Sequence, residues 1–437
     1  MNHTVKIIGA GLAGCEAAWQ LANRGINTLL YEMKPDKMSP AHSRAGFAEL
    51  VCSNSLRSSD ISNAAGLLKE EMRSLNSLII ESAYETKIPA GGALAVDREK
   101  FSALITDKIR NHPRIEIKTG EVTDIPDGFV IIATGPLTSD TFSKNIAALF
   151  PDKKMLIFFD AAAPIVTIES IDHDSSFFAS RYDKGDADYI NCPMNEEEYN
   201  VFYTELIKAE TALVRDFENT GIFEGCMPIE VMAKRGEDTM RFGPLKPVGL
   251  RNPKTGEKAY AVVQLRQDNK EGTLYNLVGF QTNLKHPEQK RVFSLIPALK
   301  NAQFVRYGVM HKNTYIDSPN LLDKYNRLIQ TPRIRFAGQI TGVEGYIESA
   351  SSGLLTGIET ANELLGIKPA DFPDYTAIGA LALYISENCV TDFQPMNINF
   401  GLIASLGKKV KNKKDRNTAI SERSLTWIRD YVERNRI

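Results

Sequence analysis

The chain has 437 residues, 43% hydrophobic and 24% charged, which is typical of a globular protein with room for two or three domains. Its 52 Lys and Arg residues balance 54 Asp and Glu residues, so net charge neither requires nor excludes a nucleic acid partner. No apolar run is long enough to span a membrane, and the N-terminus lacks the features of a signal peptide. We therefore expect a cytoplasmic protein with no membrane contact.

The cysteines are scattered and odd in number, which excludes a disulfide framework. They are Cys15, Cys52, Cys192, Cys226 and Cys389. The sequence contains no C-x-x-C pair, and its six histidines form no cluster with ligand spacing. We therefore expect no metal site.

A glycine-rich turn follows the first apolar segment, in the sequence V-K-I-I-G-A-G-L-A-G of residues 5–14. It predicts a strand, a tight turn and a helix over residues 12–24, with the helix N-terminus facing a pyrophosphate. A second strand is expected over residues 27–31, and the carboxylate that follows it can bind a ribose. The predicted dinucleotide residues are Gly9, Ala10, Gly11, Leu12, Ala13, Gly14 and Glu32.

The next segment is a weakly periodic stretch, residues 34–62, which we expect to be a functional loop. Apolar spacing predicts one helix over residues 63–82, then a break at 89–95. Asp97 is expected to cap a helix that ends near residue 111. Strands are expected over residues 115–118 and 128–133, and the second runs into Thr134 and Gly135, as in flavoproteins where the backbone approaches the dinucleotide again.

A mixed pattern of strands, short helices and proline-containing turns occupies residues 163–326 and predicts an inserted α+β domain. A strand over residues 333–337 then runs into a second glycine-rich loop and a long helix, residues 347–365, which suggests a return to the same ligand. We predict an α/β fold: a discontinuous, glutathione-reductase-like FAD-binding Rossmann domain, residues 1–162 and 327–437, interrupted by that insertion. The further cofactor residues are Thr134, Gly135, Gly338, Gln339, Gly342, Gly345 and Tyr346.

Two cysteines lie where nearby cations could stabilise a thiolate. Cys52 lies in a polar loop near Arg57, and Cys226 precedes Lys234 and Arg235. Composition alone does not separate a reactive cysteine from an inert buried one. The other three cysteines are expected to be inert.

A basic run near the C-terminus holds six cations and one acid within residues 408–416. Such a run is usually a solvated loop, but with an RNA substrate it becomes a surface for phosphates. Its cations are Lys408, Lys409, Lys411, Lys413, Lys414 and Arg416.

Six motifs together resemble one family, the folate- and FAD-dependent tRNA (uracil-5-)-methyltransferases, over nearly the whole chain. They are G-A-G-L-A-G-C-E-A-A from residue 9, L-V-C-S-N-S-L-R-S from 50, G-C-M-P-I-E from 225, R-F-G-P-L-K-P-V-G-L from 241, H-K-N-T-Y-I from 311 and F-A-G-Q-I-T-G-V-E-G-Y from 336. The resemblance implies FAD as cofactor, 5,10-methylenetetrahydrofolate as carbon donor and NADPH or NADH as reductant. The implied acceptor is C5 of a T-loop uridine in tRNA, and no DNA partner is expected.

The resemblance also implies a covalent mechanism, in which a thiolate adds to uracil C6 and a general base removes the C5 proton. We assign Cys226 as nucleophile and Cys52 as base, with the reverse assignment open. His311 is implied to stack on the folate, and Tyr346 to lie against the flavin. The implied phosphate contacts are the basic run and Lys246, Arg251, Lys285 and Lys290.

Three alternatives are also compatible with the sequence. The chain could resemble the related wobble-uridine tRNA-modifying flavoprotein, although that protein typically has an additional helical tail. It could apply the same chemistry to ribosomal RNA, which motifs at the flavin do not distinguish. It could also be an RNA-binding module with a merely structural FAD, but the two cysteine loops argue against that function.

Overall fold

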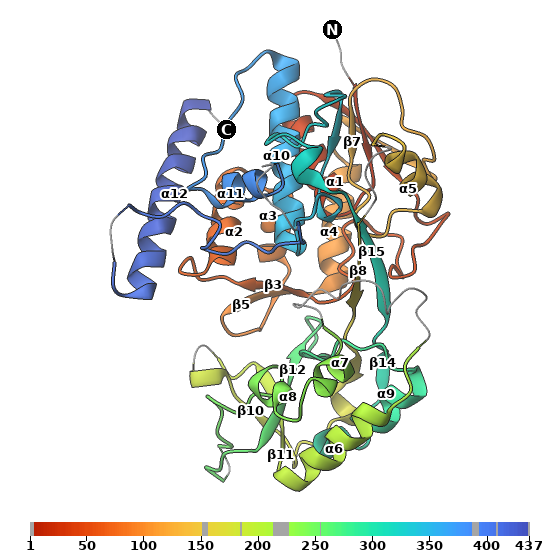
Figure 1. Cartoon of the computed structure of the whole chain (residues 1–437), viewed down its shortest axis with the longest axis vertical. Coiled ribbons are helices and arrows are strands. Elements are labelled where there is room, and N and C mark those ends of the chain that lie inside the picture. Colours follow the sequence, from red (N-terminus) through yellow and green to blue (C-terminus); the bar gives the residue numbers. More distant parts are fainter. Residues whose placement is uncertain are drawn as a thin grey trace.

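The computed structural model describes residues 4–150, 156–183, 186–212, 227–253, 255–386, 393–407 and 410–435. It has an upper lobe of helices around a parallel sheet and a lower lobe around an antiparallel sheet (Figure 1). The strands β8 (Leu156–Ala161) and β15 (Met310–Tyr315) pair antiparallel and run between the two lobes. No helix in the described ranges is long and apolar enough to cross a membrane.

The upper sheet has the strand order β16-β7-β1-β2-β6, with all strands parallel. Its strands are β1 (Thr4–Ile8), β2 (Asn27–Glu32), β6 (Ile115–Thr119), β7 (Val130–Ile132) and β16 (Ile334–Phe336). The helix α1 (Leu12–Asn23) connects β1 to β2, as predicted. Because β16 pairs with β7 across about half the chain, the sheet is completed only after the lower lobe. The predicted discontinuous Rossmann-type α/β fold is confirmed.

Glycines bring the two ends of the upper lobe together. The long helix α10 (Tyr346–Leu365) packs on α1, and a Cβ atom on Gly353 would lie 2.2 Å from the Ala13 carbonyl oxygen. A side chain on Gly357 would likewise come within 2.8 Å of Ala17 O. This close crossing places the N-termini of α1 and α10 at the same pocket.

The predicted helix over residues 63–82 is wrong in one respect, because the structure has two helices, α2 (Ala64–Ser74) and α3 (Leu78–Glu85). Asn76 interrupts them with a φ of 58°, and the Ser77 hydroxyl caps α3 by accepting from Ile80 N at 3.2 Å. The apolar spacing continues across the break because both helices bury their apolar side chains in the same core.

A small antiparallel sheet forms where we expected a loop and a break. It contains β3 (Ser55–Ser58), β4 (Lys87–Ile88) and β5 (Ala93–Val96), in the order β3-β5-β4. Strands this short carry too few residues for a period-2 signal. The following helix α4 (Arg98–Arg110) begins after its predicted cap, Asp97, whose carboxylate accepts from two backbone N–H groups.

The lower lobe contains a six-stranded sheet in the order β10-β11-β12-β13-β9-β14. The strands are β9 (Ile165–Thr167), β10 (Phe177–Phe178), β11 (Tyr189–Met194), β12 (Ala261–Gln267), β13 (Leu274–Leu277) and β14 (Phe304–Arg306). The accompanying helices are α6 (Glu196–Lys208), α7 (Ile229–Lys234), α8 (Thr239–Phe242) and α9 (His286–Phe293). Its core includes the packed rings of Phe202, Phe280 and Phe293.

Three further helices belong to the upper lobe: α5 (Asp140–Ala147), α11 (Ala377–Tyr384) and α12 (Lys413–Asn435). The basic run is therefore helical from Lys413 onward, and not a loop throughout. Lys408 and Lys409 lie outside the described residues.

A buried carboxyl group holds α11 and α12 against α2. Glu71 accepts from Ala377 N at 2.7 Å, from Ile378 N at 2.9 Å and from the Ser424 hydroxyl at 2.5 Å. Burial raises its pKa from 4.5 to about 7. The folded state therefore holds this proton more tightly than the unfolded chain, and the resulting stability is lost as the pH rises toward 7.

We expect Glu71→Gln to remove a pH dependence of stability worth up to about 3 kcal/mol between about pH 4.5 and 7. The measurement is the thermal midpoint of wild type and variant at several pH values in that range. Glu70→Gln, at the neighbouring and more exposed position of α2, is the matched control. A wild-type profile unchanged by Glu71→Gln would contradict the assignment.

Candidate functional site

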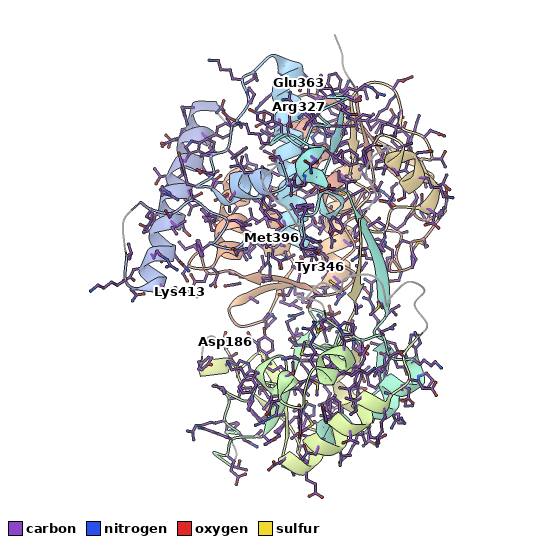
Figure 2. All side chains as sticks on the ribbon, in the orientation of Figure 1. Asp186, Arg327, Tyr346, Glu363, Met396 and Lys413 are labelled. Carbon is purple, nitrogen blue, oxygen red and sulfur yellow. The ribbon has the colours of Figure 1, made fainter. Side chains whose placement is uncertain are left out.

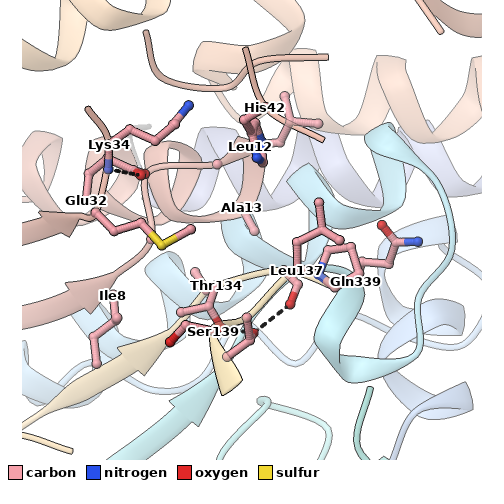
Figure 3. A pocket seen from close by; sticks show the side chains of 18 of the residues that line it. Ile8, Leu12, Ala13, Glu32, Lys34, His42, Thr134, Leu137, Ser139 and Gln339 are labelled. Carbon is pink, nitrogen blue, oxygen red and sulfur yellow. Dashed lines mark hydrogen bonds between the residues drawn. The ribbon is translucent and has the colours of Figure 1, made fainter. Parts of the chain in front are cut away.

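A pocket opens at the C-terminal ends of β1, β2 and β7, between the N-termini of α1 and α10 (Figure 3). It encloses about 1130 Å³ of empty space, including its open mouth, which suits a large ligand. The predicted cofactor residues that line it are Gly9, Gly11, Leu12, Ala13, Glu32, Thr134, Gly135, Gly338, Gln339 and Tyr346. The other four, all among the described residues, lie outside its lining and are Ala10, Gly14, Gly342 and Gly345.

Gly14 and Gly11 of the first turn have different structural roles. A Cβ atom on Gly14 would lie 1.8 Å from Gly9 O, so Gly14 allows the turn and the helix to pack. Gly11 precedes α1, and a Cβ atom there would have nothing within 4 Å. The space at Gly11 adjoins the free N–H groups of a helix N-terminus, which is the geometry that binds a pyrophosphate.

Glu32, the last residue of β2, lies beside the first glycine-rich turn. Its carboxylate accepts from Ala10 N at 2.9 Å and from Lys34 N at 3.0 Å, which fixes its position at the pocket wall. Each carboxylate oxygen keeps further acceptor capacity for a ribose hydroxyl. Ala10 thus contributes by orienting Glu32, and the set of donors and acceptors fits a dinucleotide.

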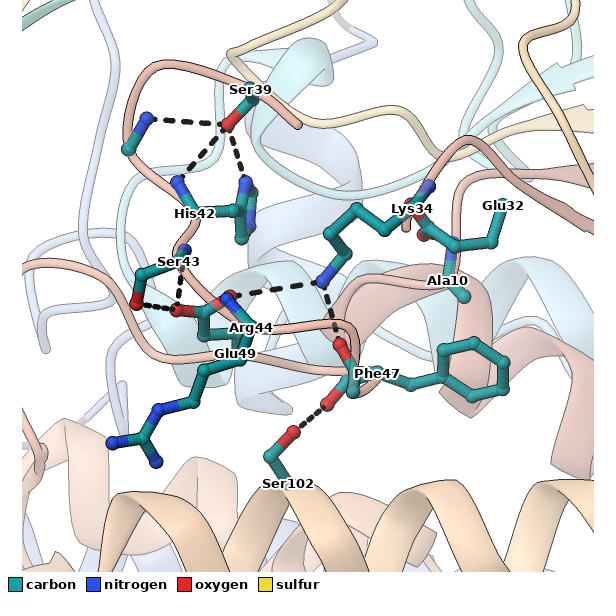
Figure 4. A network of polar contacts seen from close by, with 12 residues as sticks. Ala10, Glu32, Lys34, Ser39, His42, Ser43, Arg44, Phe47, Glu49 and Ser102 are labelled. Atoms are coloured by element: carbon teal, nitrogen blue, oxygen red, sulfur yellow. Dashed lines mark hydrogen bonds and ion pairs between the residues drawn. The ribbon is translucent and has the colours of Figure 1, made fainter. Parts of the chain in front are cut away.

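The loop after β2 forms a second wall through polar contacts (Figure 4). Lys34 Nζ donates to Gly46 O at 2.6 Å and lies 3.8 Å from the Glu49 carboxylate. Ser43 donates to the same carboxylate, and the Ser39 hydroxyl lies 2.5 Å from His42 Nδ1. Sequence reasoning missed these residues because the loop has no periodic pattern.

The conformation of the second glycine-rich loop, residues 338–345, is fixed by its glycines and by an internal hydrogen bond. Gly342 has a φ of 86°, and a Cβ atom there would lie 2.3 Å from the Phe393 ring. Gly345 has a φ of 107° and directly precedes α10. Gln339 Nε2 donates to Glu344 Oε2 at 2.6 Å. Gly342 and Gly345 therefore support the loop, while Gly338 and Gln339 face the pocket.

Tyr346 connects this pocket to Cys52. Its hydroxyl oxygen accepts from Cys52 N at 2.8 Å and from Ser53 N at 3.2 Å, and it lies 3.0 Å from Cys52 Sγ. Burial raises the pKa of Tyr346 well above 10, so the phenol keeps its proton at neutral pH. With two N–H groups already donated to its oxygen, the phenol is arranged to donate its hydrogen to the Cys52 sulfur.

Three arginines hold the loop around Cys52, and the first of them is Arg266. From β12 in the lower lobe, it donates to Asn54 Oδ1 at 3.0 Å and to Ser53 Oγ at 2.7 Å. Burial lowers its pKa, yet an arginine stays cationic at neutral pH. These bonds join the cysteine loop to the lower lobe.

The other two arginines hold the residues just before Cys52. Arg306, from β14, donates to Val51 O at 2.5 Å, and Arg98, from α4, donates to Leu50 O at 2.9 Å. Arg98 is itself paired with Asp268 at 3.0 Å. No sequence motif predicted any of the three arginines, since each acts through contacts formed only in the folded chain.

The remaining predicted residues are dispersed. Cys226 lies outside the described residues, as does Cys389. Cys15 and Cys192 are buried, and burial raises the pKa of both thiols, which fits the inert role expected for them. His311 belongs to β15, where its backbone is paired with Asp160 of β8.

The predicted RNA contacts occupy separate parts of the surface. Lys246 and Arg251 follow α8, while Lys285 and Lys290 lie at α9. Lys285 Nζ lies 2.5 Å from Glu210 Oε2, which offsets its charge. The described cations of the basic run, Lys411, Lys413, Lys414 and Arg416, are exposed. Figure 2 labels Lys413, which begins α12 in the upper lobe.

Comparison with known proteins identifies relatives along the whole chain. Residues 4–368 match the family described as glucose inhibited division protein A. The protein named methylenetetrahydrofolate--tRNA-(uracil-5-)-methyltransferase TrmFO of Acetivibrio thermocellus is 60% identical over 435 residues, 99% of this chain and 100% of that protein. The protein of the same name from Lactiplantibacillus plantarum is 58% identical over 98% of this chain and 97% of its own length.

Solved structures support the fold alone. Aquifex aeolicus GidA, in its form II crystal, superposes with a TM-score of 0.69 at 16% identity, over 98% of this chain and 74% of that protein. The high sequence identity to the TrmFO proteins gives the more specific family assignment, and it agrees with the resemblance seen in the motifs. The chain therefore belongs to the glucose inhibited division protein A family and, within it, to the TrmFO proteins.

Proposed function

We propose that this protein is a folate- and FAD-dependent methyltransferase that methylates uracil C5 in tRNA. The observation that carries the proposal is 55–60% identity, over nearly the full length, to relatives named as methylenetetrahydrofolate-dependent tRNA (uracil-5-)-methyltransferases. The proposal extends to a T-loop uridine as the target. It also includes a cytoplasmic location and domain boundaries near residues 162 and 326.

The residues of the pocket are suited to hold FAD. The N-terminus of α1 beside Gly11 would receive the pyrophosphate, and Glu32 would receive the ribose. When bound and reduced by NAD(P)H, FAD supplies the reducing equivalents that convert a transferred methylene group to a methyl group. Tyr346 lines the pocket and also contacts Cys52, so the flavin site adjoins the thiol chemistry.

The proposed protein chemistry begins with a thiolate that adds to uracil C6. The new C–S bond breaks the C5=C6 double bond and leaves C5 as a nucleophilic enolate carbon. After C5 bonds to the one-carbon unit, a general base removes the C5 proton and the bond between the transferred carbon and its carrier breaks, which leaves an exocyclic methylene group. Two-electron reduction of that methylene to a methyl group restores the C5=C6 double bond and expels the thiolate from C6. We assign addition to Cys226 and proton removal to Cys52, whose sulfur can accept the Tyr346 hydrogen bond; the opposite assignment is tested below.

The function is tested with purified protein, labelled 5,10-methylenetetrahydrofolate, NADPH and unmodified tRNA. We expect label on uracil C5 of the T-loop, located by nuclease digestion and mass spectrometry. A parallel reaction contains unmodified ribosomal RNA. Label in ribosomal RNA alone would overturn the substrate, and label at a wobble uridine would assign the protein to the other tRNA-modifying activity.

We expect Gly11→Ala to weaken FAD binding by more than about tenfold without unfolding the protein. The added methyl group meets no protein atom within 4 Å, but it projects into the space proposed for the pyrophosphate. The measurements are the flavin absorbance of the purified protein and FAD titration of the apoprotein. Gly14→Ala is the contrasting variant, because its methyl group clashes with Gly9 O and lowers stability. FAD affinity unchanged in Gly11→Ala would contradict the pyrophosphate site.

A further inference from the structure

A second large cavity of the upper lobe lies apart from the FAD pocket and has no role in the chemistry above. We call it the α2–α12 cleft; it is bounded by residues 57–58 and 62–65, the segment 398–406, and residues 413–420 of α12. It contains about 1510 Å³ of empty space, including its open mouth. Among the described residues that line it none is acidic, whereas Arg57, Lys413 and Arg416 are cationic.

The walls of the α2–α12 cleft are fixed by hydrogen bonds within the protein. Asn417 Nδ2 donates to Ser62 O at 3.1 Å, and the Ser421 hydroxyl donates to Ile61 O at 2.7 Å. Arg423 donates to Ser405 O at 2.8 Å and so binds the segment 398–406 to α12. A ligand would therefore meet a preformed cleft and would not have to order it.

The groups that face the cleft favour a phosphate chain with exposed bases. Lys413 and Arg416 are exposed in the first turn of α12, where the helix dipole adds to their positive charge. Ala64 and Ala65, at the start of α2, supply a second helix N-terminus. Phe400 is half-buried in the cleft wall and can stack with a base.

The cleft is also connected to the cysteine site. The Arg57 guanidinium pairs with Glu348, which offsets its charge, and the same Glu348 oxygen accepts from Ile398 N at 2.9 Å. Glu348 lies two residues after Tyr346, which contacts Cys52. Figure 2 shows Lys413 at the end of α12 nearest the lower lobe, level with β3. A strand that leaves the cleft along β3 therefore leads toward Cys52.

We propose that the α2–α12 cleft binds the sugar-phosphate backbone of the tRNA strand next to the target uridine, with Lys413 and Arg416 on phosphates and Phe400 on a base. The inference rests on the proposed function, because it takes tRNA as the substrate. It adds to that function a defined path for the RNA, and it includes a residue, Phe400, that carries no charge.

The test measures binding of fluorescently labelled, unmodified tRNA by anisotropy over a series of salt concentrations. We expect the double variant Lys413→Ala/Arg416→Ala to bind at least about tenfold more weakly and to lower the slope of log K against log salt by about 2. Phe400→Ala should bind about tenfold more weakly with an unchanged slope. Arg416→Lys should keep the slope, since it keeps the charge.

The matched control is Lys144→Ala/Lys368→Ala, which removes two exposed lysines outside the cleft. Lys144 lies on α5, and Lys368 follows the far end of α10, about 30 Å along that helix from Tyr346. Equal thermal midpoints and flavin content would show that every variant is folded. The control should bind tRNA like wild type.

The possible outcomes test the cleft proposal and the proposed function separately. If wild type methylates tRNA but the double variant and Phe400→Ala bind tRNA with wild-type affinity and salt slope, the cleft proposal is overturned and the proposed function stands. If the wild-type holoenzyme neither binds nor methylates tRNA, both are overturned. An equal loss of binding in the double variant and in the lysine control would show nonspecific charge attraction and would also overturn the cleft.

Discussion

Replacing Cys52 with alanine is expected to reduce tRNA methylation by about 10² to 10⁴-fold, the contribution typical of a positioned general base. The alanine cannot accept the C5 proton, and Tyr346 loses the sulfur that lies 3.0 Å from its hydroxyl. The FAD pocket should be unaffected, because Cys52 does not belong to its described lining. The measurement is single-turnover methylation of unmodified tRNA by flavin-loaded protein.

A second experiment, on cysteine variants, decides which cysteine attacks the uracil. With tRNA that contains 5-fluorouracil, the covalent adduct persists because fluorine replaces the C5 proton. Cys52→Ala should still form this adduct, and Cys226→Ala should form none and show no turnover. The opposite pattern would exchange the two roles. Cys192→Ala is the control, since that thiol is buried in the lower lobe and its loss should leave methylation intact.

The dinucleotide pocket was predictable because its steric constraints act between residues that are close in the sequence. A turn as tight as that at Gly9, with a φ of 101°, and a helix packed on it at Gly14 exclude any side chain at those positions. These steric needs appear as glycines at fixed spacing. The same reasoning predicted β1, α1 and β2 within one residue at each end.

The surroundings of Cys52 were not predictable, because they are made by contacts between distant residues. Arg266 is 212 residues from Asn54, and Tyr346 is 294 residues from Cys52. Arg266 lies in β12, where side chains on both faces of the strand are buried, and the residue order of the strand does not show what the arginine contacts. The sequence therefore predicted two candidate cysteines and an inserted domain, but not the contacts between the two lobes that position Cys52.

The break between α2 and α3 shows the opposite case, in which a local signal was present and was overridden. Leu75, Leu78 and Ile79 continue the helical spacing and are all fully buried. The chain nevertheless turns at Asn76, a residue type that tolerates a positive φ, and restarts at a serine cap. Burial alone does not fix helix continuity, and the cap residues are the better indicator.

Arg266→Met is expected to reduce methylation by about 10²-fold, through displacement of the Cys52 loop and without loss of FAD. The substitution keeps an apolar stem but removes the donors to Ser53 and Asn54, which releases the loop from the lower lobe. A displacement of about 1 Å at a reacting group is enough for a loss of this size. The measurements are single-turnover methylation, flavin content and thermal midpoint.

The control for this variant is Arg335→Met, because Arg335 is also a buried strand arginine, 1% exposed, but pairs with Glu363 far along α10 from Tyr346. Both variants lose a buried charged hydrogen bond, at a cost of about 1.5 to 3 kcal/mol. Only Arg266→Met should slow methylation at a temperature where both are folded, and Arg266→Lys should restore part of the rate by supplying one donor. Equal losses in the two methionine variants would show that Arg266 stabilises the fold and does not position Cys52.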